Sequence, residues 1–208
     1  VQLNTGFEAR FFERFNVNFE YYIRKSDDLL FTQPLPPSTG FSGYDANIGA
    51  IENKGFDIEL GANVVNSKNF NWNIDVNLSH FKNEITKLPQ KEMIQGSKKW
   101  MVGHGIYDWY VRKYAGVDPN TGKSLWYQDV THVDPVTNEV VVDSVITTTN
   151  YSAATRYYTG TSSLPDLTGG ITNTFKIYDF DLSFLLTFGI GGQVYDASYA
   201  ALMHGNAT

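Results

Sequence analysis

The sequence predicts an all-β protein made of long antiparallel strands. Apolar and polar residues alternate with period two over stretches of roughly 9–13 residues, whereas strands of soluble proteins average about 5–6. Very short turns join some of these stretches. All seven prolines, at positions 34, 36, 37, 89, 119, 135 and 165, lie outside them. Because proline cannot donate a hydrogen bond to a neighbouring strand, this distribution fits strands that run without interruption.

The clearest element is a hairpin formed by residues 55–66 and 70–82 around the turn Ser67-Lys68-Asn69. In its second strand, apolar side chains fall on one face and polar side chains on the other. The apolar positions are Phe70, Trp72, Ile74, Val76 and Leu78, and the polar ones are Asn71, Asn73, Asp75, Asn77 and Ser79. Two architectures need such a strand. One is a soluble antiparallel sheet over a core, and the other is a membrane β-barrel with lipid outside and water inside.

The same alternation predicts four further strands, at residues 3–12, 15–25, 169–177 and 180–190. Glu13-Arg14 forms a tight turn between the first two, and Tyr178-Asp179 forms one between the last two. A tilted strand needs about 9–11 residues to cross a bilayer, and the predicted strands are long enough to do so.

The remaining connections, residues 26–54 and 83–168, are predicted as long irregular loops. If the tight turns share one side of the sheet, 83–168 holds an even number of crossing strands, zero included. Within it, residues 117–123 carry turn-forming proline and glycine, so a hairpin turn is expected there rather than a calcium-binding loop. Short turns on one rim and long extracellular loops on the other favour the membrane barrel.

Composition excludes several functions. The formal net charge of −6 argues against nucleic acid as a partner, which requires a basic surface. The chain has no cysteine, and its four histidines are far apart in the sequence, which disfavours a zinc site. Since neither a phosphate-binding loop nor a nucleophile elbow occurs, we expect no catalytic, metal-binding or cofactor-binding residues, and a protein that is not an enzyme.

Aromatic pairs are the remaining candidates for binding. Trp109-Tyr110 and Trp126-Tyr127 lie within the predicted 83–168 loop. Flat aromatic faces suit the apolar faces of sugar rings and peptide groups, so these four residues are candidate substrate-binding residues. The alternative is that they belong to a membrane-interface girdle or to hairpin packing.

Five segments together resemble the SusC/RagA family of TonB-dependent outer-membrane transporters. They are YYIRKSDDLL (21–30), NIGAIENKGFDIEL (47–60), FNWN (70–73), YAGVDPNTG (114–122) and GGITNTF (169–175). Each segment alone is a weak signal. Their order and spacing over most of residues 1–195 make the resemblance specific.

The resemblance implies a β-barrel of roughly 22 strands with an N-terminal plug domain in the complete protein. It implies the outer membrane of a Gram-negative cell and import of oligosaccharides or peptides with energy from the TonB complex, contacted through the missing N-terminal region. It also implies a SusD-like surface lipoprotein as partner. Residues 1–208 are expected to be a partial barrel from its later half, because the plug is absent and residues 203–208 lack a terminal aromatic side chain.

In this interpretation one face of the strands meets the lipid bilayer and the other lines the lumen. The predicted lipid-facing residues are Phe15, Val17, Phe19, Ile58, Leu60, Trp72, Ile74, Val76, Phe184 and Leu186. The predicted lumen-facing residues are Asn18, Glu20, Glu59, Asn73, Asp75, Asn77 and Thr174. Two alternatives stay open: a soluble carbohydrate-binding β-sandwich, whose apolar faces would pack on each other, and a surface adhesin.

Overall fold

The computed structural model describes residues 1–35, 37–41 and 43–202 of the 208-residue chain. Pro36, Ser42 and residues 203–208 lie outside the described residues. The prediction that the chain lacks a terminal aromatic side chain concerns 203–208 and therefore falls outside them as well. The chain divides into two compact units. The first comprises Val1–Met93, Trp100–Tyr107 and the chain from Thr161 onward, and the second comprises Ile94–Lys99 and Asp108–Gly160.

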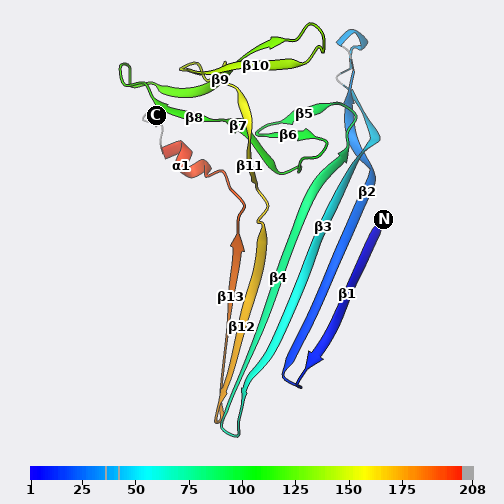
Figure 1. The fold of residues 1–208 in the computed structure, drawn as a ribbon, viewed down its shortest axis with the longest axis vertical. Coiled ribbons are helices and arrows are strands. Elements are labelled where there is room, and N and C mark those ends of the chain that lie inside the picture. Colours follow the sequence, from blue (N-terminus) through cyan, green and yellow to red (C-terminus); the bar gives the residue numbers. More distant parts are fainter. Residues whose placement is uncertain (36, 42, 203–208) are drawn as a thin grey trace. The chain divides into compact units, whose positions relative to one another are not determined.

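The first unit is built on a six-stranded sheet in which all neighbouring strands are antiparallel (Figure 1). Its strands, in spatial order, are β1 (Gln2–Phe11), β2 (Phe15–Pro34), β3 (Gly43–Asn66), β4 (Phe70–Lys87), β12 (Leu167–Ile177) and β13 (Phe180–Ile190). Six strands occur where the alternation predicts them. Short turns join β1 to β2, β3 to β4 and β12 to β13 at one end of the sheet.

Two of these turns use left-handed backbone geometry. Phe12 and Glu13 have φ angles of 51° and 55°, and Arg14 N donates to Phe11 O at 3.0 Å. Tyr178 has a φ of 54° in the β12–β13 turn. Such conformations match the twist of the flanking strands, so each hairpin closes with few residues.

The sequence-based prediction of an irregular loop at 26–54 is wrong for most of that range. β2 and β3 continue to pair beyond Lys25↔Glu52, as far as Pro34↔Gly43. The register shifts between Ser26 and Leu29, and Asp28 has a φ of 54°. This bulge inserts residues that break the period-two pattern. The pairing of β2 with β3 therefore continues without the alternation that would reveal it in the sequence. Pro34 is the last residue of β2, so one proline does lie in a strand, at its end.

β4 pairs directly with β12, from Ile177↔Phe70 to Thr168↔Ser79. The residues between β4 and β12 in the sequence therefore add no strand between these two strands in the described sheet. They are not irregular throughout, because the chain between β4 and β12 forms seven short strands. These are β5 (Glu92–Gln95), β6 (Lys98–Met101), β7 (Asp108–Arg112), β8 (Tyr114–Val117), β9 (Ser124–Val133), β10 (Val140–Thr148) and β11 (Arg156–Ser162).

The short strands form two sheets, one in the order β10-β9-β8 and one in the order β11-β7-β6-β5. The predicted turn at 117–123 joins β8 to β9, with Asp118 capping it. The Asp118 carboxylate accepts hydrogen bonds from Asn120 N at 2.9 Å and Thr121 Oγ1 at 2.6 Å. These oxygens are used within the turn, which fits the hairpin interpretation.

Helix is scarce in this fold. The 3₁₀ turn η1 (Pro37–Thr39) follows β2, and the short helix α1 (Ala197–Leu202) lies near the end of the described chain. Within the described ranges, no helix has the length and apolar character needed to cross a membrane.

Candidate functional site

Strand register joins the apolar stripes of the six strands into one surface, here called the apolar face. Val17 lies opposite Ala9 and Leu60, and the row continues through Val76, Ile171 and Leu186 on β4, β12 and β13. Directly paired residues point to the same side of a sheet. The register therefore places the ten predicted lipid-facing residues on the apolar face and the seven predicted lumen-facing residues on the opposite side, here called the polar face.

The apolar face is not covered by the part of the chain that the structure describes. Phe184 is 43% exposed and Leu186 is 57% exposed. The buried hydrophobic residues among the described positions are only Ala50, Ile85 and Ala154. A soluble domain stabilises itself by burying such a face, and contiguous exposed apolar surface of this extent marks contact with lipid or protein.

Aromatic rings lie on both sides of the aliphatic row. On one side, the centroids of Phe7 and Phe19 are 5.7 Å apart and those of Phe19 and Phe56 are 6.3 Å apart. On the other side, Phe175 stacks with Trp72 at 5.7 Å and with Phe184 at 6.0 Å. An apolar band flanked by aromatic side chains is typical of the outward surface of a membrane β-barrel.

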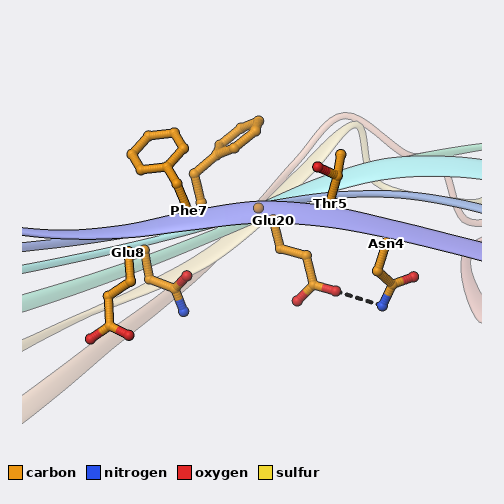
Figure 2. A pocket seen from close by; sticks show the side chains of 8 residues that line it. Asn4, Thr5, Phe7, Glu8 and Glu20 are labelled. Carbon is orange, nitrogen blue, oxygen red and sulfur yellow. Dashed lines mark hydrogen bonds between the residues drawn. The ribbon is translucent and has the colours of Figure 1, made fainter.

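The polar face carries amides, hydroxyls and carboxylates that bond to one another. Figure 2 shows one shallow hollow on the β1–β2 hairpin, where Asn4 and Glu20 point away from the side that Phe7 occupies. Asn4 Nδ2 donates to Glu20 Oε1 at 2.6 Å, and Asn18 Nδ2 donates to Glu59 Oε2 at 3.3 Å. Such a wet surface suits the wall of a water-filled lumen.

The second unit holds the four predicted substrate-binding residues, divided between two strands. Trp109 and Tyr110 lie on β7, and Trp126 and Tyr127 lie on β9. Consecutive strand residues point to opposite sides, so each pair contributes one ring to each side of its sheet. The arrangement therefore does not offer the four rings as a single platform.

The four rings have separate neighbours within this unit. Lys98 Nζ lies 3.2 Å from the centroid of the Trp109 ring. The Tyr110 ring lies 5.1 Å from that of Tyr158. Lys113 Nζ lies 5.4 Å from the Tyr127 ring. Cation–π and aromatic contacts of this kind stabilise the short strands, as the packing alternative requires. Binding of substrate by these four residues stays a prediction.

Trp126 belongs to an aromatic cluster that sequence reasoning missed. Its ring makes edge contacts with Tyr114 at 5.5 Å and with Tyr151 at 4.9 Å. Arg112 Cζ lies 4.3 Å from the Tyr151 ring, and Arg112 Nε donates to Ala154 O at 3.2 Å. Aromatic faces beside a guanidinium can contact a sugar ring or a planar polar group. No sequence signal linked Tyr151 to Trp126, because their contact joins distant positions of the chain.

Two further groups in this unit have shifted pKa values. Burial lowers the pKa of the Lys98 ammonium, against a smaller opposing effect of Asp108. Burial, followed by a hydrogen bond to Asp129, raises the pKa of the Tyr157 phenol. Over the described residues, no three His, Cys, Asp or Glu side chains are grouped so as to hold a metal ion.

Comparison with known proteins gives relatives of one kind. The chain is 27% identical to TonB-dependent receptor P3 of Formosa agariphila, over 99% of this chain and 22% of the receptor. It is 29% identical to receptor P26 of the same organism, over 93% of this chain and 20% of the receptor. It is 36% identical to SusC of Bacteroides thetaiotaomicron over 41% of this chain and 9% of SusC. No family model matches the chain.

Solved structures agree with these relatives. The RagAB peptide transporter superposes with a TM-score of 0.74 at 29% identity, over 91% of this chain and 21% of the transporter chain. Its 'open-open' state as a peptide importer gives a TM-score of 0.77 at 28% identity, over 92% of this chain and 20% of the other.

The antiparallel sheet, its two contrasting faces and these similarities match part of the β-barrel of a TonB-dependent transporter. Within that class, the chain is SusC/RagA-like. It spans about a fifth of the length of the curated receptors that it matches over most of its own length. These relatives are named as receptors and transporters, which is consistent with a function that is not enzymatic.

Proposed function

We propose that this chain forms part of the wall of an outer-membrane active transporter in a Gram-negative cell. The transporter imports oligosaccharides or peptides, draws energy from TonB and works with a SusD-like surface lipoprotein. In this arrangement the apolar face meets lipid, the polar face lines the lumen, and the short strands between β4 and β12 belong to an extracellular excursion.

The observation that carries the proposal is the register of the six-stranded sheet. Five neighbouring pairs of strands keep the same alternation in phase, so that Ala9, Val17, Leu60, Val76, Ile171 and Leu186 form one uninterrupted aliphatic row. A one-residue slip in any pair would turn the apolar side chains of one strand to the polar face. A fixed register is expected where one side of the sheet meets lipid and the other meets water, because a slip would be unfavourable on both sides.

The soluble β-sandwich is less well supported. It requires a second layer on the apolar face, and within the described residues that face is open to its surroundings. A surface adhesin would not need a polar face that continues across six strands. The similarity of the chain to transporters also favours import over adhesion.

Single-cysteine labelling of the full-length transporter tests the assignment of the faces. Val76→Cys on the apolar face should react with a membrane-soluble reagent and resist a charged one. Asn77→Cys, the next residue along β4, should react with a charged reagent that has access to the lumen. Equal reactivity of the two positions with both reagents would contradict the assignment.

Import is tested separately, with growth on defined oligosaccharides and defined peptides. Deletion of the transporter gene should abolish growth on its substrate class, and loss of TonB or of the membrane proton gradient should have the same effect. Purification of the transporter from outer membranes should retain a surface lipoprotein. Uptake that persists without TonB would exclude active transport of this kind.

Trp109, Tyr110, Trp126 and Tyr127 remain proposed contacts for the imported molecule. Trp126 is the strongest of the four, because Tyr114 and Tyr151 extend its aromatic surface. Trp126→Ala should raise the substrate concentration needed for half-maximal uptake. Trp100→Ala, which removes a tryptophan of β6 that is not among the proposed contacts, is the matched control.

A further inference from the structure

Three adjacent strands change from apolar to charged at the same level of the apolar face. On β2, the next residue after Ile23 on this face is Lys25. On β3, Lys54 lies next to Phe56 on the same face, and on β4, Lys82 lies next to His80. The charged group, here called the charged border, consists of Lys25, Glu52, Lys54, Lys82 and Glu84. Its members lie in two neighbouring cross-strand rows, Ile23↔Lys54↔Lys82 and Lys25↔Glu52↔Glu84.

Glu52 organises this border. Its side chain is only 10% exposed, and its carboxylate forms ion pairs with Lys25 Nζ at 2.9 Å and with Lys54 Nζ. The side chains of Lys25 and Lys54 are 55% and 51% exposed. A covered carboxylate therefore holds two half-exposed ammonium groups side by side, and each ammonium keeps further donors free to face outward.

Lys82 adds a third ammonium on the neighbouring strand. Its side chain is 69% exposed, and its Nζ lies 3.2 Å from Glu84 Oε2. Three lysines thus stand against two glutamates, one of which is nearly covered. The border is locally positive although the whole chain has a net charge of −6, so the positive charge is not a general property of the protein.

The position of the border matches the edge of a membrane. Lys25 is ten residues from Phe15 on the same strand and the same face. At about 3.3 Å per residue and a strand tilt of about 40°, this separation is roughly 25 Å along the membrane normal. The apolar band of a membrane barrel is also about 25 Å tall, so Lys25 stands at the level of the lipid headgroups.

We propose that Lys25, Lys54 and Lys82 bind the phosphate of an anionic lipid headgroup at this membrane surface. The inference rests on the proposed function, since it requires that the apolar face meet lipid. The acyl chains of the same lipid lie against Phe19, Phe56 and neighbouring apolar side chains. One lipid molecule thus satisfies both the apolar face and the border, which a soluble polyanion does not.

The test uses the full-length transporter in nanodiscs that contain equal amounts of phosphatidylglycerol and phosphatidylcholine. Headgroup-specific spin-labelled lipids report which lipid is enriched next to the protein. Each lysine near an anionic surface contributes about fivefold to binding, so Lys→Gln changes at positions 25, 54 and 82 should remove the preference stepwise. Salt should weaken the preference of the unmodified protein.

A matched control replaces three other lysines by glutamine. Lys68 lies in the turn between β3 and β4, Lys123 follows the turn after Asp118, and Lys176 lies on the polar face. This variant has the same change in net charge and should keep the lipid preference. Lys→Arg changes at the three border positions should also keep it, because guanidinium binds phosphate.

The outcomes separate this inference from the proposed function. A fluorescent label on Val76→Cys should report an apolar membrane environment in all of these variants, which also shows that they fold. If that label reports lipid and the glutamine variant at the border keeps the full preference, the border does not bind headgroups. A soluble phosphate would be the ligand instead of a lipid if inorganic phosphate abolished the preference at an ionic strength at which sodium chloride leaves it intact. If the label reports water, the proposed membrane location itself fails.

Discussion

Trp72 Nε1 donates a hydrogen bond to Asn173 Oδ1 at 3.2 Å, joining β4 to β12 on the apolar face. Asn173 is a polar residue among the apolar side chains on this face of β12, and it is 8% exposed. Burying an amide without a partner is unfavourable, and in lipid no water replaces the lost bond. The indole of Trp72 provides that partner while its ring stacks on Phe175. The pair therefore joins two strands that are far apart in the sequence, toward the end of the sheet at which the short turns lie.

Asn173→Ala should destabilise the full-length transporter by about 1–3 kcal/mol, because the indole N–H of Trp72 loses its acceptor in an apolar setting. Trp72→Phe in the Asn173→Ala background should add less than it does alone. A double-mutant cycle from denaturant unfolding in detergent micelles measures this coupling, which we expect to be about 0.5–1.5 kcal/mol. Additive effects of the two changes would show that the hydrogen bond does not contribute to stability.

Val76→Arg should destabilise the membrane-inserted protein by about 2–4 kcal/mol if Val76 lies near the bilayer midplane. Its place in the central aliphatic row, between Leu60 and Ile171, supports that depth. Asn77→Arg on the polar face should have a much smaller effect, because an arginine there meets water. Unfolding from liposomes by guanidinium compares the two variants, and equal losses of stability would argue against the face assignment.

The six long strands could be predicted because each side of the sheet has a uniform environment along its whole length. From Phe70 to Leu78, every second residue faces the same medium, so the pattern is local and visible. Where the backbone departs from the regular ladder, the pattern disappears. The bulge at Asp28 shifts the register, and the continued pairing of β2 with β3 could not be recognised from sequence alone.

The candidate binding residues were less predictable, for a different reason. Trp126 attracted attention as part of an aromatic pair, but its contacts with Tyr114 and Tyr151 depend on how short strands and turns fold on one another. The hydrogen bond from Arg112 to Ala154 brings the 150–155 turn beside the cluster. Contacts between such distant positions carry no periodic signal, so the sequence could indicate candidate rings but not which of them form one surface.

The turn after β8 should lose local stability in acid. Hydrogen bonds from Thr121 and from Asn120 lower the pKa of Asp118 below its ordinary value of 3.8. A carboxyl whose pKa is lower in the folded state stabilises the fold above the unfolded value, and this contribution disappears as pH falls through the folded value. Asp118→Asn should therefore accelerate amide exchange of Gly122, which bonds to Asp118 O, at neutral pH. The difference from the unmodified protein should vanish well below pH 3.8. A difference independent of pH would point to the backbone geometry of the turn instead.

Gly55→Ala should disturb the polar face at its junction with the upper part of β2. Gly55 lies directly opposite Tyr22, and a Cβ atom added to Gly55 would be 2.6 Å from Tyr22 Oη and close to His80 O. The phenol is the end of a movable side chain, whereas the carbonyl is backbone that would have to shift. We therefore expect a loss of about 1–3 kcal/mol from overpacking, with only partial recovery when Tyr22→Ala removes the ring. Gly61→Ala is the control, since its nearest neighbours are the movable side chains of Asp75 and Asn16 at 3.1 and 3.5 Å. Full rescue by Tyr22→Ala in thermal unfolding would show that the tyrosine ring alone requires the glycine.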